Sequence, residues 1–172
     1  FTVTAWVNVY ERSRGQQMIV AKNVYARNQR AWGLMVDADN RFRFYLRHNG
    51  WQTVGSETIP VPGRWFHVAA VVSAGHGRLY VNGRLEGEAD LGPSVPETEA
   101  PVTLGGVDNA GTLMQLLHGA LDEVQLYDHP IPSEEIAAMA DRTPAPHEIP
   151  KPPEPYTLWK GGDLPEGENV PL

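Results

Sequence analysis

Apolar and polar residues alternate at the start of the chain, with Phe1, Val3, Ala5, Val7 and Val9 on one side of the alternation. A period of two is typical of a β-strand that buries one face. Similar runs recur at short spacing, and we predict strands over residues 2–9, 17–22, 31–37, 41–48, 51–58, 65–73, 77–82, 101–105 and 116–127. A series of short strands separated by turn residues indicates an all-β sandwich or barrel.

Three dipeptides mark turns between these strands. Asn49-Gly50 and Asn82-Gly83 each join two strand-like runs. Asn and Gly take the two positive-φ positions of a type I′ turn with little strain, so both dipeptides predict β-hairpins. Asp39-Asn40 is a weaker signal for a third hairpin.

The sequence contains one helix signal. Ser133 precedes the run 134–140, and a serine N-cap followed by acidic residues suits the helix dipole. Because two helical turns are not stable alone in water, we expect this helix to pack on the sandwich through Ile136 and Met139.

Length and composition fit a single domain. The chain has 172 residues, of which 41% are apolar, enough for one core of ordinary size. Nine or more antiparallel strands are too many for an immunoglobulin-like domain. We therefore predict an all-β fold, a two-sheet antiparallel jelly-roll sandwich with one short C-terminal helix.

Composition changes near residue 142. Residues 142–172 hold eight of the 15 prolines and little apolar periodicity. We therefore assign residues 1–141 to the domain and residues 142–172 to a Pro-rich linker or strap that leads to a further domain. Residues 156–159 are apolar enough to dock on something. Because the chain opens inside a strand without a leader, we expect it to be a piece of a longer protein.

Charge and residue types argue against several functions. The 14 basic and 21 acidic side chains give a formal charge of −7 without a cluster of Lys or Arg, so we expect no nucleic-acid partner. The chain has no cysteine, which excludes disulfides, thiolate metal sites and cysteine nucleophiles. No run of 18 apolar residues occurs in the sequence, so we expect no membrane span.

The order of several motifs resembles one family. The run PGRWFHVAAVVSAGHGRLYVNGRLEG is the most specific part, and LHGALDEVQLYDHPIPSEEIAAM is the second. FTVTAWV, MIVAK, WGLMVDADNRFRFYL and PVTLGG stand in the matching order. Residues 1–141 thereby resemble the laminin-G-like, or concanavalin-A-like, lectin/glucanase jelly-roll domains of the bacterial accessory type.

The resemblance implies a sandwich of two curved antiparallel sheets that is usually non-catalytic. Such domains are often attached to secreted bacterial glycoside hydrolases, sialidases among them, or to adhesion proteins. Sugar binding is common in them, and calcium is frequent. The chain lacks the strand that usually precedes the FTVTAW-type strand. Either the sequence begins inside the domain, or another segment such as residues 156–159 covers the exposed edge.

Asp122 is the candidate metal ligand. In ALDEVQLYD it shares a period-two face with Val124 and Leu126, which we expect to point into the core. A carboxylate at the inner end of that face needs a partner. The resemblance puts a calcium ion there, and calcium takes carboxylate and carbonyl oxygens. Backbone N–H groups, an arginine or water would also serve, so both alternatives stay open.

The titratable residues give no indication of catalysis. Glycosidases need two carboxyl groups flanking one bond. Glu86 and Glu88 have strand spacing, but they follow Asn82-Gly83 in a glycine-rich return strand, where we expect an exposed edge. The E-x-D-x-E pattern of laminarinase-type relatives is absent, and the histidines form no zinc-type pair. We interpret His67 as a satisfied structural histidine and predict no catalytic residue.

Aromatic residues are the best binding candidates, because sugar rings stack on Trp and Tyr while neighbouring polar groups hold the hydroxyls. The candidate carbohydrate-binding residues are Trp51, Tyr45, Tyr25, Trp32, Asn49, Asp108 and Asn109. Trp51 follows a hairpin turn, so we expect it to be the most exposed. Burial in the core is the alternative for Trp32.

These observations predict a non-catalytic carbohydrate-binding or accessory module of a larger exported protein, extracellular or periplasmic, whose parent is a glycan-degrading enzyme. Its partners would be a polysaccharide or glycan and a neighbouring domain of the same polypeptide. The alternative is a structural spacer, or an adhesion or protein-interaction domain, that packs against a neighbouring catalytic domain.

Overall fold

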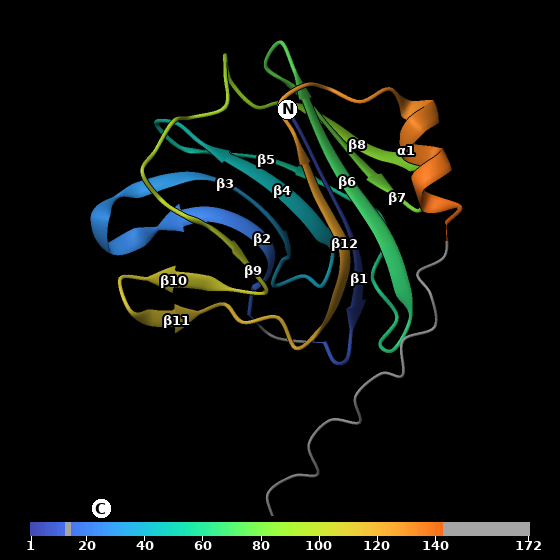
Figure 1. The fold of residues 1–172 in the computed structure, drawn as a ribbon, viewed down its shortest axis with the longest axis horizontal. Coiled ribbons are helices and arrows are strands. Elements are labelled where there is room, and N and C mark those ends of the chain that lie inside the picture. Colours follow the sequence, from blue (N-terminus) through green and yellow to red (C-terminus); the bar gives the residue numbers. More distant parts are fainter. Residues whose placement is uncertain (13–14, 143–172) are drawn as a thin grey trace, which may run out of the picture.

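Two antiparallel sheets packed face to face form the body of the protein (Figure 1). The computed structural model describes residues 1–12 and 15–142. The predicted all-β sandwich is confirmed, with the jelly-roll arrangement of two five-stranded sheets. The predicted Pro-rich strap, including its apolar part, lies outside the described residues apart from Arg142.

The first sheet has the strand order β12-β1-β6-β7-β8. Its strands are β1 (Thr2–Val9), β6 (Trp65–Ser73), β7 (His76–Val81), β8 (Arg84–Asp90) and β12 (Gly119–Tyr127). Consecutive strands β6, β7 and β8 pair as hairpins, whereas β1 pairs with β12 from the other end of the domain. β1 therefore has a hydrogen-bonded neighbour on both sides.

The second sheet has the strand order β5-β4-β3-β2-β9. Its strands are β2 (Gln17–Val24), β3 (Gln29–Val36), β4 (Phe42–Arg47), β5 (Trp51–Gly55) and β9 (Val102–Leu104). A short 3-10 helix, η1 (Tyr25–Arg27), connects β2 to β3. This sheet is also built mainly from hairpins between consecutive strands, as the turn signals predicted.

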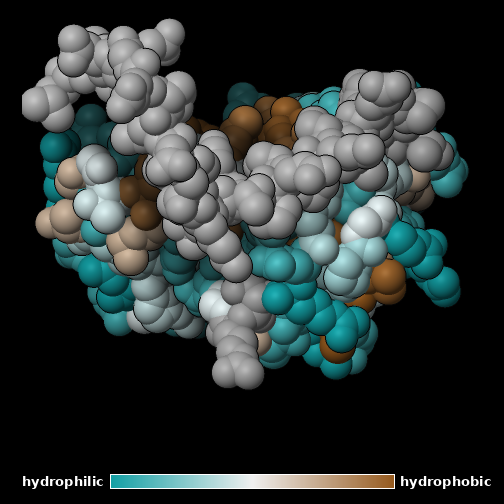
Figure 2. Space-filling view, turned by 90° about the horizontal axis from the view of Figure 1, so that it is seen from below, coloured by the Kyte–Doolittle hydropathy of each residue, from teal (hydrophilic) through white to brown (hydrophobic). Residues whose placement is uncertain are grey.

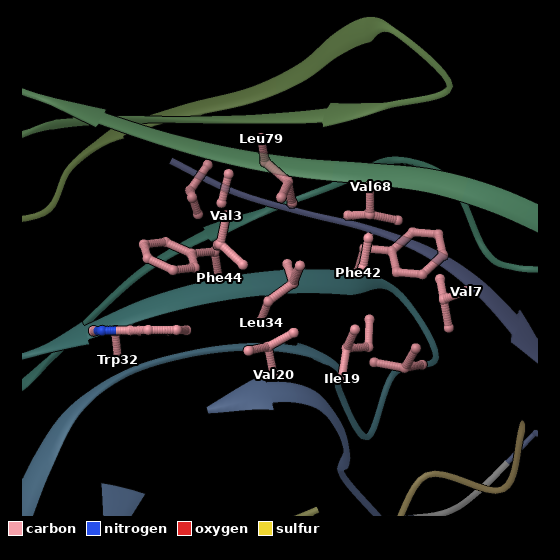
Figure 3. Close-up of a cluster of buried hydrophobic side chains, with 14 of the residues drawn as sticks. Val3, Val7, Ile19, Val20, Trp32, Leu34, Phe42, Phe44, Val68 and Leu79 are labelled. Atoms are coloured by element: carbon pink, nitrogen blue, oxygen red, sulfur yellow. The ribbon is translucent and has the colours of Figure 1, made fainter. Parts of the chain in front are cut away.

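The core lies between the two sheets and contains the apolar half of each alternating strand (Figure 3). Val3, Val7, Val68 and Leu79 project from the first sheet. They meet Ile19, Val20, Trp32, Leu34, Phe42 and Phe44 from the second sheet. Most of these side chains are fully buried, and removal of this apolar surface from water is the main force that holds the sheets together.

The two Asn-Gly dipeptides form different turns. Asn82 and Gly83 have φ of 48° and 75°, the two positive values that a type I′ turn requires. Asn49 and Gly50 do not have positive φ; β4 and β5 are joined by the three residues 48–50, with the His48 N–H donating to the Gly50 carbonyl at 3.1 Å. Both hairpins are confirmed, but the predicted type I′ turn at residue 49 is wrong.

The predicted helix is α1 (Ser133–Ala140), and it packs on the outer face of the first sheet. Ile136 is fully buried against Ala69, Val71 and Tyr80, with Met139 beside it. Ser133 is inside the helix, because the N-cap is Pro132 and no side chain caps the helix start. The packing prediction is therefore confirmed and the serine N-cap is wrong.

A small hairpin that the sequence analysis missed lies beside the second sheet. β10 (Val107–Asn109) and β11 (Thr112–Met114) form a separate two-stranded sheet. Val107 is fully buried against Met18 and Ala21 on the side of β2 that faces away from the core. Each strand is only three residues long, too short for an alternating pattern to stand out.

The sandwich is closed along one side by β8 and β5, the edge strands of the two sheets. The Glu86 carboxylate accepts hydrogen bonds from the Glu57 and Thr58 N–H groups at 3.0 and 2.8 Å, and from the Thr58 hydroxyl at 2.6 Å. At Gly87 the backbone of β8 comes so close that a Cβ atom would lie 2.2 Å from the Gly55 carbonyl oxygen. Glu86 thus links β8 of the first sheet to the segment that follows β5 of the second sheet.

Candidate functional site

A hollow of about 450 Å³ opens on the outer face of the second sheet, the face turned away from the core. Strands β3, β4 and β5 provide its floor and one wall, while η1, the β10–β11 hairpin and the segment before β2 provide the rest. It is lined by Gln16, Tyr25, Met35, Asp37, Arg43, Tyr45, Trp51, Thr53, Met114 and Gln115.

Two aromatic rings from the β4–β5 hairpin shape the floor and wall. The alternation in β4 turns Phe42 and Phe44 into the core and Tyr45 onto the outer face. Tyr45 is only 2% exposed, whereas Trp51 on the neighbouring strand is 45% exposed. Their rings meet edge to face, with centroids 4.9 Å apart. Tyr45 therefore holds Trp51 in place and leaves much of the indole open to a ligand.

The Tyr45 hydroxyl is fixed from below. It accepts a hydrogen bond of 2.9 Å from the Nδ2 of Asn23, which is fully buried. Burial raises the pKa of Tyr45 well above its usual value, with the neighbouring Tyr25 adding to the effect. The phenol is therefore neutral at physiological pH, so it can act only through its hydroxyl and its ring.

The opposite wall is a chain of polar side chains. Tyr25 donates from its hydroxyl to Gln115 Oε1 at 3.2 Å, and Gln115 in turn donates to Gln16. Gln16 then donates to Asp37 at 3.0 Å, and Asp37 forms an ion pair of 2.7 Å with Arg43 Nε. These contacts hold together a polar wall beside a space large enough for a small ligand.

The structure brings together three of the predicted binding residues. Tyr25, Tyr45 and Trp51 all line the hollow. Trp32 does not: it is 3% exposed and packs in the core between Phe1 and Phe44, at centroid distances of 5.0 and 6.5 Å. The structure therefore assigns Trp32 to the core rather than to the binding surface.

The predicted polar residues lie beside the hollow and do not line it. Asn49 is an exposed residue of the β4–β5 turn. Asp108 accepts the Gly111 N–H at 2.7 Å and so closes the β10–β11 turn. Asn109 accepts the Ala26 N–H at 2.6 Å and ties this hairpin to η1. Asp108 and Asn109 thus help to position Tyr25 and Gln115, which do line the hollow.

Sequence reasoning missed Gln16, Met35, Asp37, Arg43, Thr53, Met114 and Gln115. Met35, Arg43 and Thr53 had a usable signal, because they alternate with core residues in their strands and so belong to the outer face. Gln16 and Gln115 had none. They lie 99 residues apart, outside any strand, and only the folded chain brings them together.

The hollow combines the indole of Trp51 with polar side chains. It therefore suits a ligand that is apolar on its ring faces and polar around its rim. Residues 1–137 match the family described as the concanavalin A-like lectin/glucanases superfamily. The chain belongs to this superfamily. The predicted laminin-G-like, concanavalin-A-like resemblance is thereby confirmed. No curated protein matches the chain at a significant level.

Solved structures with the same superfamily fold include modules of sialidases. The CBM40 of the Ruminococcus gnavus IT-sialidase bound to α2,3-sialyllactose has a TM-score of 0.68 and 16% identity, covering 81% of this chain and 80% of that one. The heptameric pentraxin of Limulus polyphemus has a TM-score of 0.62 and 20% identity, covering 81% and 68%. A Trypanosoma rangeli sialidase has a TM-score of 0.60 and 19% identity, covering 81% of this chain and 22% of that one. At these identities the likeness shows the fold.

Glu86 and Glu88, the two carboxylates with strand spacing, both take part in contacts outside the hollow. Glu86 is half-buried and joins the two sheets through three hydrogen bonds. Glu88 is exposed and accepts a hydrogen bond of 3.0 Å from Arg78, which is the main reason why its pKa is lowered; His76 lies 3.5 Å away. A lowered pKa keeps Glu88 ionised, the opposite of what a general acid needs.

A β-bulge changes the environment of Asp122. Trp6 pairs with Asp122 and Thr4 with Gln125, so β12 has one extra residue here, and Glu123 has a positive φ of 45°. Asp122 therefore lies opposite Trp6, on the face away from the core, while Leu121 packs against the core. The prediction that Asp122 shares the core face with Val124 and Leu126 is wrong, because the bulge interrupts the period of two.

The Asp122 carboxylate has a backbone partner. Its Oδ1 accepts the Glu123 N–H at 2.8 Å, one of the two alternatives that the sequence left open. In the part of the chain that the structure describes, no three Asp, Glu or His side chains gather as metal ligands. The side chains around Asp122 thus do not fit a carboxylate-rich calcium site, and calcium there stays a prediction from the family resemblance. A rise in melting temperature with calcium that Asp122→Asn removes would confirm it.

Proposed function

We propose that this domain is a non-catalytic glycan-binding module and that the hollow above Tyr45 is its binding site. The observation that carries the proposal is the 45% exposed Trp51 ring, packed at right angles to the buried Tyr45 ring in a hollow that hydrogen-bonding side chains also line. A sugar can place a C–H face on the indole and direct its hydroxyls toward Gln16, Gln115 and Thr53.

The size and openness of the site fit weak, specific binding of a short glycan. A hollow of about 450 Å³ is in the range of ordinary small-ligand sites. The superfamily fold is shared with the Ruminococcus gnavus module that was solved with sialyllactose, which supports a glycan as the ligand class. The involvement of Glu86 and Glu88 in other contacts supports a non-catalytic role.

We further propose that the domain belongs to a larger exported protein, extracellular or periplasmic, and that a glycan-degrading enzyme is its parent. Within residues 1–12 and 15–142 no helix is long and apolar enough to cross a membrane. The sequence of the full-length gene product tests this proposal, because it would contain the catalytic domain that the module serves.

Replacement of Trp51 tests the binding site. We expect Trp51→Ala to weaken glycan binding at least about tenfold, the equivalent of 1.4 kcal/mol, because the stacking surface is lost while the core is untouched. Leu85→Ala is the matched control, since Leu85 is 47% exposed on β8 in the other sheet. A glycan array identifies ligands, and calorimetry or NMR titration of the best ligand compares the variants.

Two results would contradict the proposal. One is a correctly folded domain that binds no glycan on a broad array. The other is glycan binding that Trp51→Ala leaves unchanged, which would place the site elsewhere.

One observation favours a second candidate, a structural spacer that packs against a neighbouring domain. Several apolar side chains around β9 and the β10–β11 hairpin are exposed, with Leu104 at 57%, Leu113 at 68% and Leu116 at 56%. Seen from below, the surface shows several separate hydrophobic patches among hydrophilic residues (Figure 2). A structure of the parent protein would decide between the two functions. If another domain covered both the hollow and the exposed Leu104, Leu113 and Leu116 side chains, the domain would be a structural spacer.

A further inference from the structure

The arginines around the hollow differ in how their charge is balanced. Arg43 lines the hollow and forms ion pairs with Asp37 at 2.7 Å and Asp39 at 2.9 Å. Arg30 on β3 and Arg47 on β4 form no ion pair with any carboxylate of the described residues. Arg30 and Arg47 therefore carry positive charge that no ion pair within the described residues balances, although the chain as a whole has a formal charge of −7.

Arg30 lies between two rings of the site. Its guanidinium carbon is 5.2 Å from the centre of the Tyr25 ring and 5.9 Å from the centre of the Trp51 ring. Both rings line the hollow, so the guanidinium lies beside two of its aromatic walls, although Arg30 is not itself a lining residue. Its charge also reaches the Tyr45 hydroxyl, where it opposes the rise of the Tyr45 pKa that burial causes.

Arg47 is on the same side of the hairpin. Its guanidinium carbon is 5.2 Å from the centre of the Trp51 ring, and its Nη1 donates to the His48 carbonyl at 2.7 Å. A guanidinium that no carboxylate neutralises gains more from an anionic acceptor than from a neutral one.

We propose that the sugar bound on Trp51 carries a negatively charged group and that Arg30, supported by Arg47, is the residue that recognises the charge. This inference rests on the proposed glycan-binding function and names its ligand class. The planar guanidinium presents paired N–H donors to a carboxylate or sulfate oxygen, while the two rings hold the guanidinium in position. Arg43 does not take this role, because Asp37 and Asp39 already neutralise it.

The test compares three ligands that share one neutral core: lactose, 3′-sialyllactose and lactose 3′-sulfate. NMR titration of the ¹⁵N-labelled protein gives the affinity for each. We expect at least one acidic ligand to bind at least about tenfold more tightly than lactose. A preference for sialyllactose identifies a carboxylate as the recognised group, and a preference for the sulfated sugar identifies a sulfate.

Three variants separate charge recognition from general effects. Arg30→Gln should lower the affinity for the acidic ligand to about that for lactose, and Arg30→Lys should restore part of it. Arg84→Gln removes the same charge from an exposed position on β8 and should change neither affinity. With the unmodified protein, added salt should weaken binding of the acidic ligand and leave lactose unaffected, because ions screen the charge of the guanidinium.

The results distinguish this inference from the proposed function. Equal affinities for all three ligands, lost in Trp51→Ala and unchanged in Arg30→Gln, would overturn charge recognition and leave glycan binding intact. An equal loss in Arg30→Gln and Arg84→Gln would also overturn it, because the effect would be one of net charge. Failure of every glycan to bind would overturn both.

Discussion

A single buried histidine illustrates how much a side chain depends on its surroundings. His67 is 2% exposed near the start of β6, with its ring 5.4 Å from that of Trp6. Its Nδ1 has no hydrogen-bond partner among the described residues. The sequence predicted a structural histidine with its hydrogen bonds satisfied; the buried structural position is confirmed, but this ring nitrogen is unsatisfied. The imidazole is therefore held in its neutral form by burial.

We predict that His67 makes the domain less stable in mild acid. Burial lowers the pKa of His67 to about 4, whereas an unfolded histidine titrates near 6.5. Between these values the unfolded chain binds more protons, so stability falls as pH falls, by up to about 1.4 kcal/mol for each pH unit. Urea unfolding at pH 7 and pH 5 should show a smaller difference for His67→Gln than for the unmodified protein. Equal differences would show that His67 does not titrate in this window.

The exposure of individual side chains limits how far the site can be predicted from the sequence. Trp32 and Trp51 both stand in strands of the second sheet, yet one is 3% and the other 45% exposed. The difference arises because Trp32 faces the other sheet, while Trp51 is at the start of an edge strand. Alternation shows which residues share a face, but it does not show which face another element will cover.

At the scale of elements, two identical dipeptides are expected to respond differently to the same substitution. Gly83 has a φ of 75°, and a Cβ there would lie 2.9 Å from the backbone of Ala137 in α1. Gly50 has no positive φ, and the nearest atom to its Cβ position is 3.7 Å away, at the flexible end of Gln52. We predict that Gly83→Ala lowers the free energy of unfolding by roughly 1–3 kcal/mol.

Gly50→Ala is the matched control and should change stability by no more than about 0.5 kcal/mol. Chemical denaturation of both variants measures the difference. Equal losses would mean that the turn after β7 does not support α1 in the way the contacts indicate. Sequence alone identifies both hairpins, but the helix that packs against one turn is known only from the fold.

At the scale of the whole molecule, the site depends on how the sandwich is closed. Most strands, the main hairpins and the helix follow from alternation and turn residues, so the sequence was sufficient to predict the architecture apart from the β10–β11 hairpin. The hollow was not predictable as a whole, because its walls combine an edge strand with segments 99 residues apart. β5 carries Trp51 and Thr53, and it is an edge strand that only β4 pairs with in its own sheet.

Attachment of β5 to β8 should therefore matter for the site. We predict that Gly87→Ala destabilises the domain by about 1–3 kcal/mol, because a Cβ at this position would overlap the Gly55 carbonyl and force β8 away from β5. Gly55→Ala is the control, since no atom lies closer than 3.9 Å to its Cβ position. Hydrogen exchange should show faster opening of the β5 amide groups in Gly87→Ala than in the control, together with weaker glycan binding. The contrary result is a loss of stability in Gly87→Ala that leaves both the exchange rates of the β5 amides and glycan binding unchanged. The second sheet would then hold β5 and Trp51 in position without help from the first sheet.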